Sequence, residues 1–138
     1  MAAADGKSTG IDGFSELLGI EYLKSVPGEA HGRVAVTDAL RQPFGIVHGG
    51  VYAALTESVC SAATYAAVAA QGMIAMGQSN NASFLRPIDA GHVNAVARAR
   101  HTGRTTWVWD VELTDDQGRL CALARISVAV RPRPGQAP

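Results

Sequence analysis

One long segment without helix-breaking residues constrains the fold of this chain more than any other feature. Between Gly50 and Gln71 the sequence contains no further glycine and no proline, and it includes eight alanines. Alanine has the highest helix propensity of all residues, whereas glycine and proline have the lowest. The sequence therefore predicts one long central helix over residues 50–71.

The side chains of this segment are apolar or small around nearly the whole circumference of the helix, so we expect other structure to wrap it. A membrane span could have the same length and alanine content. Glu57, Ser58, Ser61 and Thr64 lie in mid-segment, however, where a bilayer would make them costly. The prediction is therefore a helix buried within a globular protein and no membrane span.

Most of the remaining chain alternates between apolar and polar residues with the period of two that is typical of half-buried strands. The pattern covers residues 20–25, 30–37, 76–85, 92–99, 106–113 and 119–130. Turn residues occupy 101–104 and 115–118. The predicted order is two strands, the helix and then four strands in a meander. It gives an α+β fold, with one curved antiparallel sheet of five to six strands around the helix.

Composition narrows the class of protein. The 138 residues carry 12 basic and 12 acidic side chains, so no global field attracts nucleic acid or an anionic membrane. The length predicts a single domain over residues 1–138, with flexible termini at 1–12 and 132–138.

Cys60 and Cys121 lack CxxC or histidine spacing, which indicates buried reduced thiols and no metal site. Charges near Met1 interrupt any signal-peptide core, so we expect a cytoplasmic protein.

The stretch before the predicted helix ends in two glycines. Gly49 and Gly50 lie where the first unpaired N–H groups emerge, at the positive end of the helix dipole. Glycine lets a ligand oxygen approach these amides, so the pattern predicts an oxyanion site, with a simple chain-turning loop as the alternative. His48 is either an acid or base, or, as we favour, a hydrogen-bond donor that shapes the loop.

Glu57 is the strongest chemical signal, because a carboxylate in an apolar helix that the sheet must cover is seldom buried without a function. Ser61 and Thr64 follow at i+4 and i+7 and predict a polar stripe that could hold a water beside the carboxylate. The alternative is a glutamate at a helix interface, satisfied by polar groups of a partner.

These residues together resemble a known family. The shared motifs are Gln42, Phe44-Gly-Ile-Val-His48-Gly-Gly, Glu57 and Ser61, then Asn81, Phe84-Leu-Arg-Pro87 and Gly103-Arg-Thr-Thr106. They are similar to hotdog-fold acyl-CoA thioesterases, and within these to the PaaI-like group that includes phenylacetyl-CoA, 4-hydroxybenzoyl-CoA and 1,4-dihydroxy-2-naphthoyl-CoA thioesterases. The resemblance covers residues 14–130 and implies hydrolysis of an acyl-CoA thioester.

The resemblance also implies a role for each matching residue. Glu57 matches the catalytic carboxylate, and the amide of Gly49 matches the group that polarises the thioester carbonyl. Gln42 matches a side chain that orients the substrate, Ser61 the residue that positions the hydrolytic water, and His48 a histidine that supports the loop. The implied substrate and CoA contacts are Asn81, Arg86, Gly103, Arg104, Thr105 and Thr106. Coenzyme A is then part of the substrate, and no cofactor is expected.

Helix geometry predicts an active site shared between subunits. Gly49 and Glu57 are eight residues apart, which is about 12 Å along a helix. One thioester carbon cannot lie about 3 Å from both. A two-fold axis that packs two such helices antiparallel would bring Gly49 of one chain to Glu57 of the other. The resemblance implies the same homodimer, commonly doubled into a homotetramer.

Two other functions fit the same residues. A hotdog dehydratase or hydratase would pair His48 with Glu57, and a non-catalytic protein would bind acyl-CoA without turnover. The residues from Gln42 to Ser61 favour a thioesterase, and a thiol leaving group with a pKa near ~8.5 needs no strong general acid. Hydrolysis is therefore the prediction, with Glu57 as nucleophile or as general base and with the acyl group open.

Overall fold

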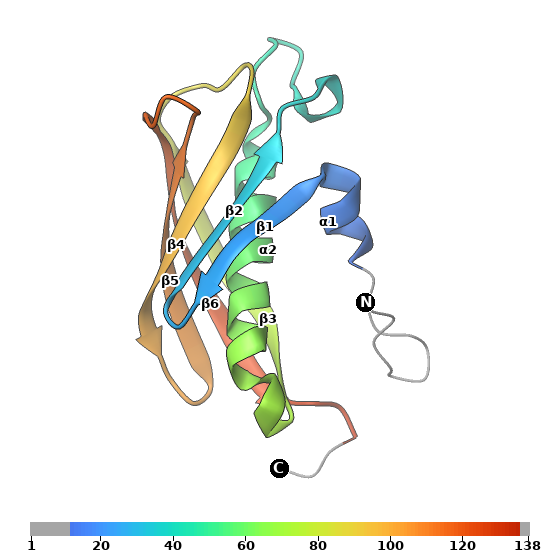
Figure 1. Cartoon of the computed structure of the whole chain (residues 1–138), viewed down its shortest axis with the longest axis vertical. Coiled ribbons are helices and arrows are strands. Elements are labelled where there is room, and N and C mark those ends of the chain that lie inside the picture. Colours follow the sequence, from blue (N-terminus) through green and yellow to red (C-terminus); the bar gives the residue numbers. More distant parts are fainter. Residues whose placement is uncertain (1–11, 136–138) are drawn as a thin grey trace.

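A computed structural model describes residues 12–135 of the chain. Its elements are α1 (Gly13–Leu18), β1 (Ile20–Val26), β2 (Glu29–Ala35), η1 (Asp38–Leu40), α2 (Gly49–Val68), η2 (Ala69–Gln71), β3 (Met73–Phe84), β4 (His92–Thr102), β5 (Thr106–Thr114) and β6 (Leu120–Pro132). The strands form one six-stranded antiparallel sheet in the order β1-β2-β4-β5-β6-β3. The sheet curves around α2, which confirms the predicted hotdog fold (Figure 1).

The long helix forms where the sequence predicts it. Its start is capped by His48, whose ring accepts a hydrogen bond from the Gly50 amide, and the helix runs to Val68. A short 3-10 turn follows and ends at Gly72, which has a φ of 75°. This left-handed conformation favours glycine and stops the helix.

The core lies between α2 and the concave face of the sheet. Leu55 and Val59 of α2 pack in one cluster with Trp109 and the inward residues of β4, β5 and β6. The Trp109 indole donates a hydrogen bond of 3.0 Å to Thr64 Oγ1, and the Thr64 hydroxyl donates to the Cys60 carbonyl at 2.8 Å. Thr64 is fully buried, so the predicted polar stripe does not extend to it.

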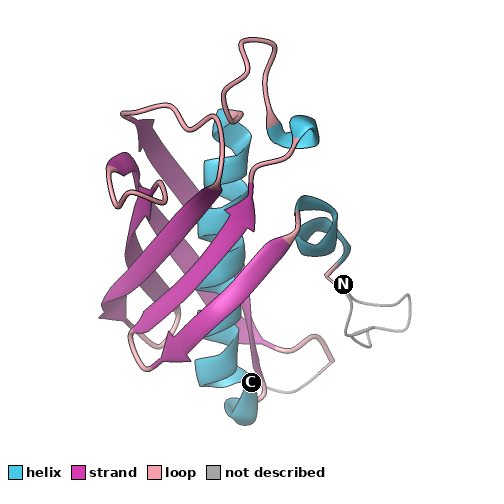
Figure 2. Cartoon of the chain, turned by 45° about the horizontal axis from the view of Figure 1, so that its top comes forward, coloured by secondary structure: helices cyan, strands magenta, loops and turns pink. Residues whose placement is uncertain are grey.

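The expectation that other structure wraps α2 on every side is wrong for the described chain. The sheet covers one side of the helix, and its strands cross the helix at an angle (Figure 2). The opposite side stays exposed at Glu57, Ala62, Tyr65 and Ala66. Alanine on this side is compatible with exposure because its side chain adds little apolar area.

The predicted four-strand meander is wrong in one respect. The strands β4, β5 and β6 do form a meander, but β3 pairs with the far side of β6 and lies at the sheet edge. Alternation of side chains shows which face of a strand is buried, not which strand lies next to it. The strand β2 therefore pairs with β4, and α2 connects β2 to the opposite edge of the sheet.

The short helix α1 was not predicted. Asp12 caps it by accepting hydrogen bonds from the Ser15 amide and hydroxyl at 3.1 and 2.6 Å, and Gly19 ends it at a φ of 76°. Of the termini predicted to be flexible, residues 1–11 and 136–138 lie outside the described residues, whereas Pro132 belongs to β6.

The prediction for the cysteines is confirmed, because both are free and buried. Burial raises the pKa of the Cys60 thiol, which keeps it protonated. In the described part of the chain, no helix has the length and apolar content that a membrane crossing requires.

Candidate active site

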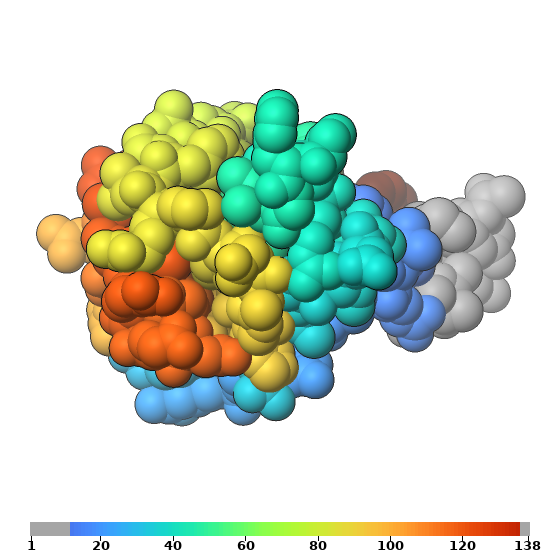
Figure 3. All heavy atoms as spheres, turned by 90° about the horizontal axis from the view of Figure 1, so that it is seen from above, coloured from blue at the N-terminus to red at the C-terminus, as the bar shows by residue number. Residues whose placement is uncertain are grey.

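The loop before α2 is held by backbone hydrogen bonds at one end of the sheet. The Val47 amide donates to the Ile88 carbonyl at 2.8 Å, and the His48 amide donates to the Leu40 carbonyl at 2.9 Å. Figure 3 shows this segment (teal) packed beside the segment that follows β3 (yellow). Because these bonds tie Val47 to Ile88 and His48 to Leu40, they position the start of α2.

Three consecutive amides at this helix start have different hydrogen bonds. The Gly50 amide donates to His48 Nδ1, and the Val51 amide donates to the His48 carbonyl, each at 2.9 Å. The Gly49 amide has no acceptor among residues 12–135. The His48 ring accepts this hydrogen bond and so shapes the loop, whereas the sequence analysis favoured a donor. The Gly49 amide is left as a donor at the positive end of the helix dipole.

A pocket of about 290 Å³ lies beside the Gly49 amide. Gln42 and Arg86 line it together with Tyr52 and Phe84. The Phe84 ring covers Gly49 so closely that a Cβ at residue 49 would lie 2.9 Å from the ring carbon Cζ. The Tyr52 and Phe84 ring centroids are 5.6 Å apart. Burial raises the pKa of Tyr52, so its hydroxyl is neutral at physiological pH.

The carboxylate of Glu57 lies in a separate groove of about 610 Å³, which Ser61 also lines. Glu57 is exposed in the described chain, so the expectation that the sheet buries it is wrong. The buried Ser61 Oγ has no hydrogen-bond partner within residues 12–135. This unpaired hydroxyl lies one helical turn from the Glu57 carboxylate.

Gly77 of β3 is a site residue that the sequence analysis missed. A Cβ at this position would lie 2.7 Å from Glu57 Cδ and 2.9 Å from both carboxylate oxygens. Only glycine therefore lets the strand approach the carboxylate this closely. The available signal was a glycine inside a strand, which often marks a close approach of another group.

The structure separates the predicted CoA contacts within one chain. Phe84, near Arg86, pairs with Ala122 of β6, whereas Thr106 pairs with Ala129. Seven residues of β6 separate these two levels, which is about 23 Å. Arg86 and the turn formed by Gly103, Arg104, Thr105 and Thr106 thus lie at opposite ends of the sheet (Figure 1). The Arg131 guanidinium donates to the Thr105 carbonyl at 2.6 Å and holds this turn.

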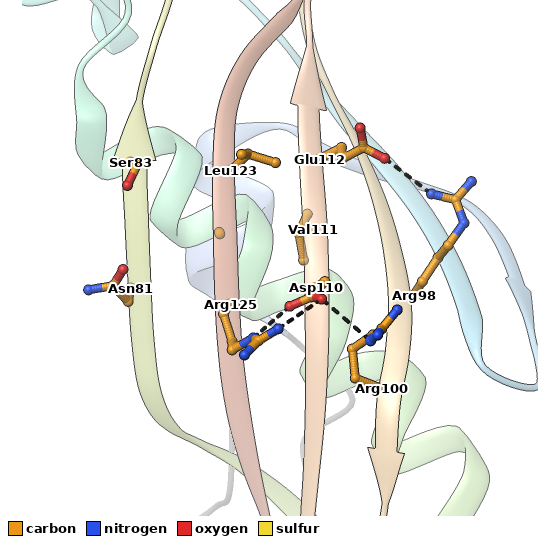
Figure 4. Close-up of a pocket in the computed structure, with 10 residues that line it drawn as sticks. Asn81, Ser83, Arg98, Arg100, Asp110, Val111, Glu112, Leu123 and Arg125 are labelled. Carbon is orange, nitrogen blue, oxygen red and sulfur yellow. Dashed lines mark hydrogen bonds and ion pairs between the residues drawn. The ribbon is translucent and has the colours of Figure 1, made fainter.

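Asn81 lies on the outer face of the sheet, away from α2. It pairs with Arg125 and lines a groove with Arg98 and Asp110, where ion pairs join neighbouring strands (Figure 4). Its neighbour Asn80 faces the helix instead and donates a hydrogen bond of 3.0 Å to the Ala53 carbonyl. The described residues contain no group of three or more His, Cys, Asp or Glu that could hold a metal ion.

A curved sheet around one long helix is the hotdog fold, and this chain adds a free amide at the helix start and a carboxylate two turns later. Residues 44–122 match the thioesterase superfamily. The chain is 35% identical over 123 residues to the proofreading thioesterase EntH of Cronobacter turicensis, with 89% of each chain covered. It is 34% identical over 119 residues to a 1,4-dihydroxy-2-naphthoyl-CoA hydrolase of Listeria monocytogenes, covering 86% of this chain and 96% of the relative.

A solved structure gives the same result. A mutant of thioesterase PA1618 from Pseudomonas aeruginosa superposes with a TM-score of 0.83 at 38% identity, covering 88% of this chain and 87% of that one. The chain belongs to the thioesterase superfamily, which confirms the resemblance seen in its motifs. It is a thioester hydrolase.

Proposed function

We propose that the chain hydrolyses an acyl-CoA thioester to a carboxylic acid and free CoA, with the Gly49 amide and the Glu57 carboxylate as the reacting groups. The observation that carries the proposal is the unpaired Gly49 amide, because the next two amides of the same turn are both occupied. Acyl transfer needs both a hydrogen-bond donor for the carbonyl oxygen and a carboxylate that attacks or activates a water. The CoA thioester named for one relative supports the substrate class.

The chemistry follows from these two groups. The Gly49 amide donates to the carbonyl oxygen, whose negative charge grows as the tetrahedral intermediate forms. Glu57 either attacks the carbonyl carbon or takes a proton from a water that Ser61 holds. If Glu57 attacks, the C–S bond breaks to leave a Glu57–acyl anhydride and CoA thiolate, and a water then hydrolyses the anhydride to the carboxylic acid. If Glu57 acts as the base, the water attacks the carbonyl carbon, the C–S bond breaks, and the proton taken up by Glu57 passes to the leaving CoA thiolate. Coenzyme A enters as part of the substrate and leaves as the free thiol, so these steps require no separate cofactor.

The reaction requires a second subunit. Gly49 and Glu57 belong to one helix and are about 12 Å apart along it. The strand β3 is an edge strand, so its outer side is available to pair with β3 of another copy. A two-fold axis there would bring Gly49 of one chain toward Glu57 of the other. The same axis would place Arg86 of one chain near the sheet end of the second subunit where the 103–106 turn lies.

We therefore propose a homodimer with two shared sites, and a homotetramer as a pair of such dimers. We place the activity in the cytoplasm, where the two free cysteines would stay reduced.

The first test is release of thiol from a panel of acyl-CoA esters, with enoyl-CoA hydration followed separately. Thiol release without hydration is expected. Hydration without thiol release would indicate a dehydratase or hydratase, and binding without either reaction would indicate a binding protein.

The second test asks whether the site is shared. Glu57→Ala and Gln42→Ala chains, each inactive alone, are unfolded, mixed and refolded together. Random pairing makes about half of the dimers mixed, and each mixed dimer has one intact site, so roughly a quarter of wild-type activity should return. Absence of activity in verified mixed dimers would place Gln42 and Glu57 of one chain in the same site.

A further inference from the structure

The groove that holds Glu57 has a wall outside the residues that match the superfamily. Phe14 of α1 and Tyr22 of β1 line this groove, together with Tyr65 of α2 and Met76 of β3. These residues are 39 to 58% exposed, so their apolar surfaces face the open groove. The family match covers residues 44–122, so Phe14 and Tyr22 belong to the segment that precedes it.

The helix α1 is fastened beside Glu57 by a small polar network. The Ser15 hydroxyl is buried and donates to Asp12 Oδ2 at 2.6 Å. It lies 2.9 Å from the Tyr22 hydroxyl and 3.4 Å from the hydroxyl of Ser58, the residue that follows Glu57. The network uses the polar atoms of α1 to hold the helix in place, and it leaves the adjacent Phe14 ring facing the groove.

The charges of the two cavities differ. The groove at Glu57 contains two carboxylates, Glu57 and Asp12, and among residues 12–135 no lysine or arginine lines it, although Arg133 donates a hydrogen bond to the Tyr65 hydroxyl at its border. The pocket at Gly49 is lined by Arg86 instead. The phosphates of CoA would be repelled from the first cavity and attracted to the second. The Glu57 groove therefore suits the uncharged, apolar acyl group.

From these observations we infer that Phe14 contacts the acyl group and limits the chain length that the enzyme accepts. This inference rests on the proposed function, because it takes Glu57 as the reacting carboxylate. The ring closes one side of the groove, while Met76 offers a flexible thioether that adapts to different acyl groups. Shape exclusion by an aromatic wall is a common way for an apolar pocket to discriminate between chains that differ by a few methylenes.

The test compares kcat/KM for hexanoyl-CoA and decanoyl-CoA, whose nucleotide contacts are identical. Phe14→Ala should raise the ratio of decanoyl to hexanoyl activity about tenfold, because the shortened side chain opens the groove. Leu17→Ala is the matched control, since Leu17 lies on the same helix, is 81% exposed and does not line the groove. Its ratio should stay within about twofold of wild type. Phe14→Leu keeps an apolar side chain and should give an intermediate ratio.

The outcomes separate the two proposals. A wild-type enzyme that releases thiol from no CoA ester would overturn the proposed function and this inference with it. An active enzyme whose ratio is the same in wild type, Phe14→Ala and Phe14→Leu would overturn only the role of Phe14. Equal shifts in Phe14→Ala and Leu17→Ala would also overturn it, because they would indicate general loosening of α1. If Phe14→Ala does not fold, Phe14→Leu against Leu17→Ala decides between the same outcomes.

Discussion

The start of α2 and the turn that holds Glu57 belong to one helix but depend on the rest of the molecule in different ways. At the start, hydrogen bonds to Leu40, His48 and Ile88 fix the loop, and the Gly49 amide has no acceptor within residues 12–135. At Glu57, the strand β3 comes close to the carboxylate at Gly77, and the side chain stays exposed in the described chain. The Gly49 end of the proposed site is therefore formed within one chain. The Glu57 end, in the proposed homodimer, is completed by the second subunit.

The difference indicates which substitutions report on chemistry and which report on folding. The backbone of the loop before α2 makes hydrogen bonds to other parts of the fold, so substitutions in this loop should affect stability and activity together. The Glu57 side chain makes no hydrogen bond to the described residues, so changes there should affect turnover with little loss of stability. Four predictions test this contrast.

Glu57→Gln should have the largest effect. Loss of the reacting carboxylate should lower kcat by at least ~10²-fold. The melting temperature should stay close to that of wild type because the side chain is exposed. Glu112→Gln, at an exposed position on the outer face of the sheet, is the control for the same chemical change. Steady-state thiol release measures both variants, and near-wild-type turnover of Glu57→Gln would contradict the catalytic assignment.

Gly77→Ala should lower kcat by about tenfold or more, because the new Cβ would lie 2.7 Å from Glu57 Cδ and displace the carboxylate. KM should change little, since no predicted CoA contact lies at Gly77. Ser79→Ala, two residues along the same strand and exposed, should leave both constants unchanged. An unchanged kcat for Gly77→Ala would show that the position of Glu57 is not set by β3.

Arg86→Ala should raise KM for acyl-CoA by about five- to tenfold and change kcat less, because a phosphate contact contributes mainly uniform binding. With an acyl-pantetheine that lacks the nucleotide, wild type and variant should have equal KM values. Arg98→Ala, on the outer face of the sheet, serves as the control for loss of a positive charge. If the KM for full acyl-CoA is unchanged in Arg86→Ala, Arg86 does not contact the nucleotide.

The smallest effect is expected on the outer face. Arg125 donates two hydrogen bonds to Asp110, of 2.7 and 3.0 Å, and they hold the pKa of this carboxyl below its usual value. The pair therefore stabilises the fold above the unfolded-state pKa of about 3.9, and its contribution is lost as the pH falls through the lower folded-state pKa. Asp110→Asn should cost less than about 1 kcal/mol at pH 7 because the pair is exposed.

Urea unfolding at several pH values measures this effect. The difference in stability between wild type and Asp110→Asn should shrink as the pH falls below about 4. Thiol release should be the same for both proteins. A difference that grows toward acid pH would contradict the assignment of the lowered pKa to the native state.

The sequence alone was enough to predict α2 and the existence of all six strands. These features follow from local propensity and from side-chain periodicity, which are properties of neighbouring residues. The candidate residues Gln42, His48, Gly49 and Glu57 could be proposed from the sequence for the same reason, because one loop and one helix contain them. The missed helix α1 also had local signals, the capping Asp12 and the terminating Gly19.

Tertiary structure decided the features that depend on distant partners. A bulge between Gly77 and Ser79 shifts the register of β3 on β6. Because strand side chains alternate, this one-residue shift directs Asn80 toward the helix and Asn81 to the outer face. The position of β3 at the sheet edge and the open side of α2 likewise depend on pairing across the whole fold. Local sequence determines which face of an element is buried, but only the assembled sheet determines what lies opposite that face.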